Sequence, residues 1–131
     1  MKTVNNVVRI PCKFSKDFFK YWLVFLKPFH GLTDRETDVA AAILNERYVL
    51  RKKISDASLL DSILMSDDIK KRIRESCNVS LSYFQFVMTK LRKSKFIIDG
   101  RVNPRFIPNY DSNSEFKLML YFTIDESKEN L

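Results

Sequence analysis

The chain has 131 residues, 45% of them hydrophobic, and a formal net charge of +7 at pH 7. That length corresponds to one domain with enough apolar side chains to form a core. The sequence contains no apolar run of the roughly 18 residues that a membrane-spanning helix needs, so we expect no membrane partner.

The residues needed for catalysis or metal binding are scarce. His30 is the single histidine, and Gly31 and Gly100 are the only glycines, so a glycine-rich phosphate loop is excluded. Two thiols without a ligand spacing, Cys12 and Cys77, fit a reducing compartment. The N-terminus lacks the apolar region of a signal peptide. We therefore predict a cytoplasmic protein that is not an enzyme and has no cofactor.

The first predicted elements are a strand and an aromatic helix. Residues 3–10 alternate apolar and polar side chains and are rich in β-branched residues, which predicts a strand. Ser15 then begins a helix that runs to about Lys27, where Pro28 and Gly31 stop it. This helix is apolar nearly all round, so we expect it to be buried, either in the core of its own domain or against a partner.

Three further helices follow. Thr33 and Glu36 have the spacing of a capping box and begin a helix that ends near residues 51–53. A shorter helix is predicted at residues 57–65. Another, at residues 66–77, begins with Ser-Asp-Asp, which combines a capping side chain with acidic residues in the first turn.

The next segment, ESCNVSLSYFQFVMTKLRKSKFIIDG, predicts a turn, a helix and a hairpin. Asn78 tolerates left-handed backbone angles and can turn the chain without glycine. Ser80 caps a helix over residues 81–94, and Asp-Gly between apolar runs signals the hairpin. The inward stripe of the helix is formed by Phe84, Val87, Met88 and Leu91. Its outer face carries Ser82, Tyr83, Gln85, Phe86, Thr89 and Lys90.

The order of helix, helix, turn, helix and hairpin over residues 32–107 resembles a winged helix-turn-helix DNA-binding domain. The pattern Ser-x-x-x-Phe-x-x-Val-Met-x-x-Leu-x-x-x-x-Phe-Ile of residues 80–97 is similar to the recognition helix and following strand of that family. The family's apolar positions are filled by Ile73, Cys77, Val79, Phe84 and Val87. The chain departs from the pattern at Arg74, where a small residue is usual, and at Asn78, where glycine is usual.

The resemblance implies an α+β, mostly helical fold with a winged helix-turn-helix core. Residues 1–31 add the N-terminal strand and aromatic helix, residues 32–108 form the core, and residues 109–131 add a last strand and an acidic tail, all in one compact domain. The last strand is predicted at residues 116–124, which alternate strongly. It has either the N-terminal strand of the same chain or that of a second copy as its pairing partner.

The positive charge is concentrated in one part of the chain. Residues 70–105 contain ten basic and two acidic side chains, a net charge of +8, whereas the rest has 13 basic and 14 acidic side chains. Phosphate attraction requires such a concentration, although a solvated basic face without a partner has the same composition.

The winged-helix resemblance implies that double-stranded DNA is the partner, with the helix after Ser80 in the major groove. A transcriptional regulator or a replication-associated factor would bind in this way. Gln85 suits adenine through its amide, and Arg101 on the wing reaches a flanking phosphate. The predicted DNA-binding residues are Lys70, Lys71, Arg72, Ser80, Ser82, Tyr83, Gln85, Phe86, Thr89, Lys90 and Arg101. Arg92, Lys93 and Lys95 have an alternative structural role at the helix end, where cations complement the helix dipole.

A second function remains open. Winged helices also serve as protein-interaction modules, and the exposed aromatic side chains Tyr83 and Phe86 suit protein contact as well as DNA contact. Small chains rich in Lys, Asn and Phe with such domains resemble proteins of tailed bacteriophages, which implies action in the host cytoplasm or a place in the virion. The alternative function is therefore a phage assembly component that binds a second copy or another phage protein through the aromatic helix or the terminal strands.

Overall fold

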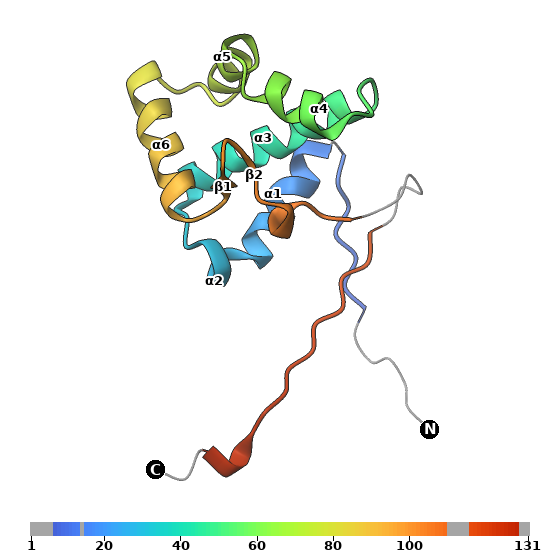
Figure 1. Ribbon diagram of the computed structural model, residues 1–131. Helices are drawn as coiled ribbons and strands as arrows, with labels where there is room; N and C mark the ends of the chain where they lie inside the picture. The colour runs from blue at the N-terminus through green and yellow to red at the C-terminus, as the bar shows by residue number, and fades with distance from the viewer. Residues whose placement is uncertain (1–6, 14, 110–115, 129–131) are drawn as a thin grey trace.

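The chain folds around one long central helix (Figure 1). The computed structural model describes residues 7–13, 15–109 and 116–128. The elements of these residues are α1 (Ser15–Phe25), α2 (Lys27–His30), α3 (Asp34–Arg51), α4 (Ala57–Leu64), α5 (Asp67–Ser76), α6 (Leu81–Lys93), β1 (Ile97–Ile98), β2 (Arg101–Val102) and the short 3-10 helices η1 (Pro104–Phe106) and η2 (Glu126–Lys128). The prediction of a mostly helical α+β fold is confirmed, with β1 and β2 forming a small antiparallel sheet.

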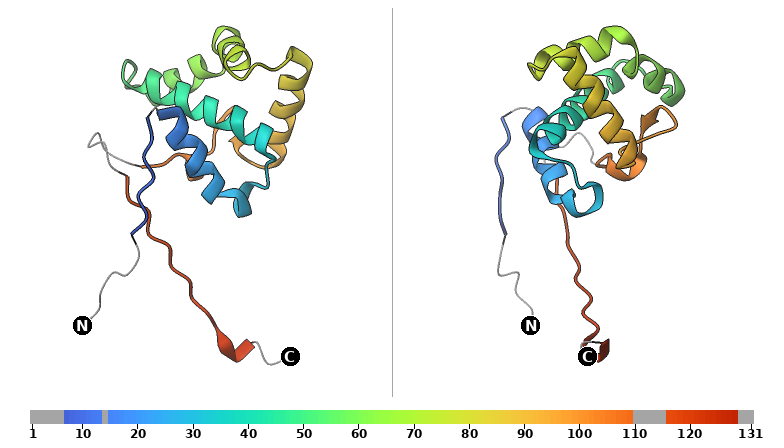
Figure 2. Two further views of the ribbon diagram at one scale, coloured as in Figure 1. Left: turned by 180° about the vertical axis from the view of Figure 1, so that it is seen from behind. Right: turned by 90° about the vertical axis from the view of Figure 1, so that its left-hand side faces the viewer.

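Helix α3 forms the centre of the core. Every side chain of residues 39–44 is buried, with at most 3% of its surface exposed. Successive residues of a helix point in different directions, so this stretch of α3 is covered all round. Helix α1 packs on one side of it, and α4, α5 and α6 pack on the others (Figure 2). Ala40, Ala41 and Ala42 lie in this stretch, and their small side chains let several helices approach α3 closely.

The start of α3 is fixed by two sets of hydrogen bonds. The backbone N–H of Thr33 donates to Glu36 Oε1 at 3.1 Å, and that of Glu36 donates to Thr33 Oγ1 at 3.3 Å, so the predicted capping box is confirmed. His30 is buried beside it and accepts from the Leu32 N–H through Nδ1 at 3.0 Å. Its hydrogen therefore lies on Nε2, which donates to the Leu23 carbonyl at 2.7 Å. The ring ties the end of α1 to the start of α3.

The boundary between the first two helices differs from the prediction. Helix α1 ends at Phe25, and Pro28 lies inside α2 instead of stopping a helix at Lys27. Proline is tolerated there because the first residues of a helix have no intrahelical acceptor for an N–H. Gly31, with φ of 63°, then ends α2 in the left-handed conformation, as glycine commonly does after a helix.

Only one face of α1 is buried. Phe19 and Leu23 are covered by the core, whereas Tyr21, Val24 and Phe25 are exposed by 44–51%. The predicted burial in the core of the chain's own domain therefore applies to one face of this helix, and burial of the other face against a partner stays a prediction. Burial is limited to one face because α3 covers one face along the length of α1, whereas the segments at Phe106 and Phe116 contact Phe18 and Trp22 and leave Tyr21, Val24 and Phe25 exposed.

The predicted terminal strands are also absent from the described residues. Residues 7–10 are exposed and form no strand, and residues 3–6 of that prediction lie outside the described residues. Residues 116–124 are extended but belong to no sheet. Both segments leave the helical body on the same side (Figures 1 and 2). Alternation predicts an extended backbone, but a strand also needs a partner edge, which the described part of this chain does not provide.

Two aromatic residues of α1 hold the chain that follows the hairpin. Trp22 Nε1 donates a hydrogen bond to the Phe106 carbonyl at 2.8 Å. Farther along, the ring of Phe116 packs edge-on against Phe18 and Trp22, with centroids 5.2 and 5.5 Å apart. Beyond Phe116, residues 117–125 extend away from the helices, and we call them the C-terminal arm. Among the described residues, no helix combines the length and the hydropathy that crossing a bilayer requires.

Candidate nucleic-acid interface

Helix α6 is held by its inner face and by the capping residue that precedes it. Phe84, Val87, Met88 and Leu91 are all buried, so the predicted inward stripe is confirmed. Ser80 caps the helix, because its hydroxyl oxygen accepts from the Tyr83 N–H at 3.2 Å. The opposite face of α6 is thereby fixed toward solvent along one edge of the molecule (Figure 2).

The turn between α5 and α6 is tight although it contains no glycine. Asn78 has φ of 53°, as predicted from its tolerance of left-handed angles. The N–H of Val79 donates to the Arg74 carbonyl at 3.2 Å, and that of Asn78 donates to the Glu75 carbonyl at 3.1 Å, which is the Schellman arrangement. Burial raises the pKa of the neighbouring Cys77 thiol, so this side chain acts as a protonated apolar filler.

The hairpin after α6 has the predicted turn. Ile97 pairs with Val102, and Ile98 pairs with Arg101. Asp99 and Gly100 have φ of 54° and 74°, and two consecutive positive values are typical of the type I′ turn that matches strand twist. Ile97 and Val102 are buried against the core, whereas Arg101 is exposed.

A basic groove lies between α5 and α6. Its volume is about 460 Å³, and the buried residues Phe84 and Met88 are part of its lining. The groove is lined by Asp67, Lys70, Lys71, Arg74, Leu81, Phe84, Gln85, Met88, Thr89 and Arg92. Four cations and one carboxylate give these walls a net charge of +3. Such a groove attracts polyanions, and the amide of Gln85 and the hydroxyl of Thr89 add hydrogen-bonding groups on its α6 side.

Two cations of this basic groove were not predicted as site residues. Arg74 follows Lys70 by four positions and therefore shares its face of α5. Arg92 follows Thr89 by three positions and Gln85 by seven, which places it on the groove side of α6. These spacings are the sequence signal from which both arginines could have been predicted as groove residues. Arg74 stands where the winged helix-turn-helix pattern has a small residue, and the Arg74 side chain lines the space between α5 and α6.

The other predicted residues of α6 form a separate aromatic face. Tyr83 and Phe86 stack with ring centroids 6.1 Å apart and planes inclined by 32°. Lys90 Nζ lies 5.3 Å from the Phe86 centroid, and the guanidinium of Arg35, on α3, lies 5.4 Å from the Tyr83 centroid. Gln85 and Thr89 line the basic groove instead. The outer face of α6 is therefore divided into a polar side and an aromatic side.

The remaining predicted residues lie outside the basic groove. Arg72 Nη1 is 3.3 Å from Glu46 Oε2 on α3, so much of its charge is compensated there. The hydroxyl of Ser80 is engaged as the helix cap, whereas Ser82 is exposed between the two sides of α6. Arg101 is exposed on the hairpin. Among the described residues, no three His, Cys, Asp or Glu side chains gather as metal ligands would.

Comparison of the chain with protein-family models, curated proteins and solved structures found no match.

Proposed function

We propose that this chain binds double-stranded DNA through α5, α6 and the β1–β2 hairpin, as a winged helix-turn-helix. The observation that carries the proposal is the basic groove, in which Lys70, Lys71, Arg74 and Arg92 face one space with a single opposing carboxylate. Among the described residues, the ion pair of this region joins Arg72 to Glu46 and includes none of these four cations.

In this proposal the two helices have different roles. Helix α6 enters the major groove with Ser82, Gln85 and Thr89 toward the base edges, since these side chains are exposed on its solvent side. The groove cations contact phosphates, which position the protein without reading sequence. Arg101 contacts a flanking phosphate, because the hairpin follows α6 directly.

The aromatic side of α6 supports a second candidate, a protein-interaction module. Phe86 is 51% exposed, and it forms a continuous surface with Tyr83 and Lys90. Exposed aromatic side chains with an adjacent cation are typical centres of protein interfaces. A phage assembly component, the alternative function predicted from the sequence, would use this surface.

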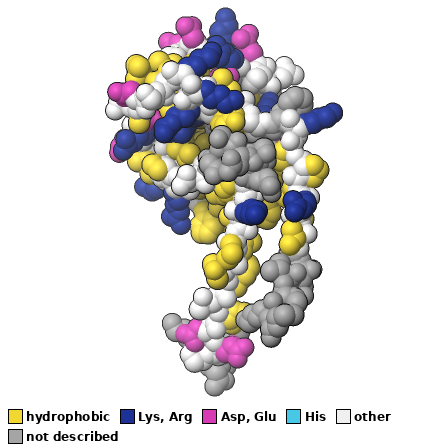
Figure 3. Space-filling model, turned by 90° about the vertical axis from the view of Figure 1, so that its right-hand side faces the viewer, with side chains coloured by type: hydrophobic (Ala, Val, Ile, Leu, Met, Phe, Trp, Pro, Cys, Tyr) yellow, Lys and Arg dark blue, Asp and Glu magenta, His cyan; other side chains and the backbone are white. Residues whose placement is uncertain are grey.

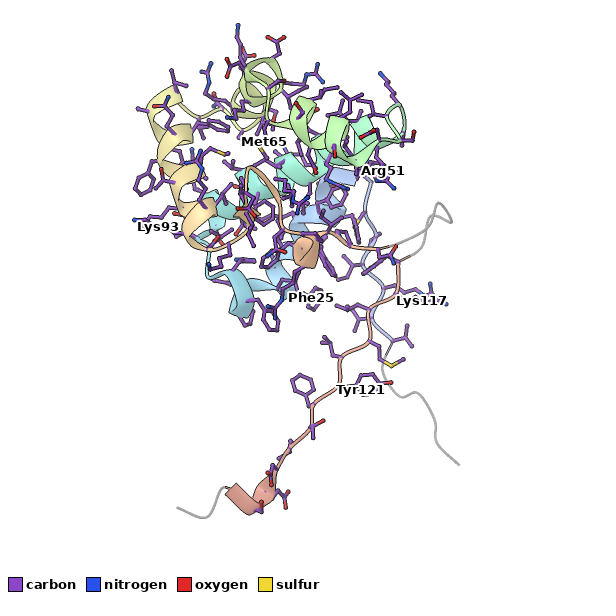
Figure 4. The ribbon with its side chains drawn as sticks, viewed as in Figure 1. Phe25, Arg51, Met65, Lys93, Lys117 and Tyr121 are labelled. Atoms are coloured by element: carbon purple, nitrogen blue, oxygen red, sulfur yellow. The ribbon has the colours of Figure 1, made fainter. Side chains whose placement is uncertain are left out.

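Binding to a random-sequence DNA duplex, measured by fluorescence anisotropy, tests the first candidate. The triple substitution Lys70→Ala, Arg74→Ala and Arg92→Ala is expected to abolish most of the binding, because it removes three of the four groove cations. A matched control removes three exposed cations elsewhere, Lys27, Arg51 and Lys53. Arg51 lies at the far end of α3 from α6 (Figure 4). Equal losses of DNA affinity in both variants would show that only net charge matters and would refute the role of the basic groove in binding.

Two single substitutions on α6 separate the candidates. If α6 reads DNA, Gln85→Ala costs about 1–3 kcal/mol at one position of a preferred site, and Phe86→Ala has little effect. If α6 binds a protein, Phe86→Ala costs about 2 kcal/mol or more of that binding, and Gln85→Ala is tolerated. The DNA titration and partner capture with the same two variants therefore rank the two candidates.

A further inference from the structure

The C-terminal arm exposes an unusual amount of apolar surface. Leu118, Met119, Leu120, Tyr121, Phe122 and Ile124 are exposed by 43–84%. Figure 3 shows hydrophobic side chains along the arm and over the part of the domain from which it leaves. In Figure 4, Lys117 and Tyr121 lie on the arm outside the helical body. Contiguous apolar surface of this kind marks an interaction site in most proteins.

The backbone of residues 117–124 of the arm is also unpaired among the described residues. Residues 117–124 are extended and make no backbone hydrogen bond within the described part of the chain. An extended segment with free N–H and C=O groups is a template for pairing with another strand. Phe116, packed on Phe18 and Trp22, anchors the start of the arm to α1. The arm is therefore presented at a fixed place on the domain.

We propose that the occupant of this edge is a second copy of the chain, whose arm pairs antiparallel with the first about a two-fold axis at Tyr121. In this register Leu118 lies opposite Ile124 of the second copy, and Leu120 lies opposite Phe122, so apolar side chains meet on one face. Lys117 lies opposite Asp125, so each dimer gains two pairs of opposite charge.

Other registers lose this complementarity. A slip of one residue brings the Leu118 and Leu120 face of one arm beside the opposite face of the other. Moving the axis to Leu120 places Lys117 opposite Thr123, so Lys117 no longer faces Asp125. Moving the axis to Phe122 places Lys117 opposite Ser127 and Asp125 opposite Met119, so the opposite charges no longer face each other. The charge pattern of the arm is thus specific for the axis at Tyr121.

A two-stranded ribbon is marginal in water and needs a covered face. The exposed side chains of α1, Tyr21, Val24 and Phe25, provide apolar surface on the helix that anchors the arm. Arm pairing also brings together two copies of the domain with two-fold symmetry. The proposal does not depend on DNA binding, but a dimer that does bind DNA would require a palindromic pair of half-sites.

Disulfide trapping tests the register. In a chain with Cys12→Ser and Cys77→Ala, oxidation of Tyr121→Cys is expected to cross-link two copies rapidly, because position 121 faces itself across the axis. The matched control Leu118→Cys is expected not to cross-link, since its two sulfurs would lie about 20 Å apart along the ribbon. Cross-linking of both variants at the same rate would overturn the proposal, because it would indicate random collision.

Sedimentation of the unaltered chain tests the dimer itself. A dimer is expected, and Lys117→Asp or Asp125→Lys alone should raise its dissociation constant by roughly tenfold, because two attractive pairs become repulsive. Mixing the two variants should restore the affinity, since all the pairs are then of opposite charge. A monomeric chain, or a dimer that neither substitution weakens, would overturn the proposal and would indicate that the arm binds a different protein.

Discussion

Two phenylalanines on α6 provide a direct test of the helix orientation on which the candidate interface depends. Phe84 is 4% exposed, and Phe86, two residues later, is 51% exposed. Replacing either with alanine changes helix propensity equally, so the difference between the two variants isolates burial.

The burial of Phe84 predicts a large loss of stability. Phe84→Ala should lower the free energy of unfolding by about 3–5 kcal/mol, the usual cost of removing a packed phenyl ring. For roughly 100 ordered residues with an unfolding entropy of about 0.2 kcal/mol/K, this corresponds to a drop in Tm of about 15–25 °C. Phe86→Ala removes a half-exposed ring and its contacts with Tyr83 and Lys90, so it should cost about 1 kcal/mol or less.

Thermal and urea denaturation followed by circular dichroism measure both losses. Equal losses for the two substitutions, or a larger loss for Phe86→Ala, would mean that α6 is rotated about its axis. The basic groove and the aromatic side would then be assigned to the wrong residues.

Three further predictions concern the parts that support the interface. Trp22→Phe should lower the free energy of unfolding by about 1–2 kcal/mol in urea denaturation, because the Phe106 carbonyl loses its donor; an unchanged midpoint would show that the bond contributes nothing. Lys95→Gly should raise the free energy of unfolding by about 0.5–1 kcal/mol, because Lys95 has φ of 65°, a backbone angle that glycine adopts at lower cost. A lower free energy of unfolding would mean that the Lys95 side chain stabilises the turn. Burial raises the pKa of both Cys77 and Cys12, and Asp17 adds to the effect at Cys12, so alkylation of either thiol by iodoacetamide should accelerate with rising pH. Because Cys77 is half-buried and Cys12 is exposed, Cys77 should react more slowly; mass spectrometry that finds Cys77 modified first would contradict its position.

Local rules predicted the parts of the fold that local rules determine. The capping box at Thr33 and Glu36 needs only residues three apart, and the turn at Asp99 and Gly100 needs two residues that accept positive φ. The buried stripe of α6 follows from the helical period. Each depends on side chains and backbone groups within one element, so the sequence contained all the information required.

The features that the sequence did not predict depend on distant parts of the chain. Pro28 was predicted to stop a helix, but the break at Leu26 places it in the first turn of α2, where proline is accommodated. The alternation of the C-terminal arm predicted an extended backbone but could not specify a partner edge. Arg74 and Arg92 line one groove because α5 and α6 diverge from the turn at Asn78, and no local pattern determines that divergence.

The salt dependence of duplex binding tests the central claim, that the basic groove binds DNA phosphates. Each phosphate contact contributes about −0.9 to the slope of log affinity against log salt concentration, so the four groove cations together with Arg101 predict a slope of about −4.5. With Lys70, Arg74 and Arg92 replaced by alanine, the slope should fall to about −1.8, the value for Lys71 and Arg101, whereas the matched variant at Lys27, Arg51 and Lys53 should retain the original value. A chain that does not bind the duplex at low salt, or a groove variant with the unaltered slope, would contradict the account.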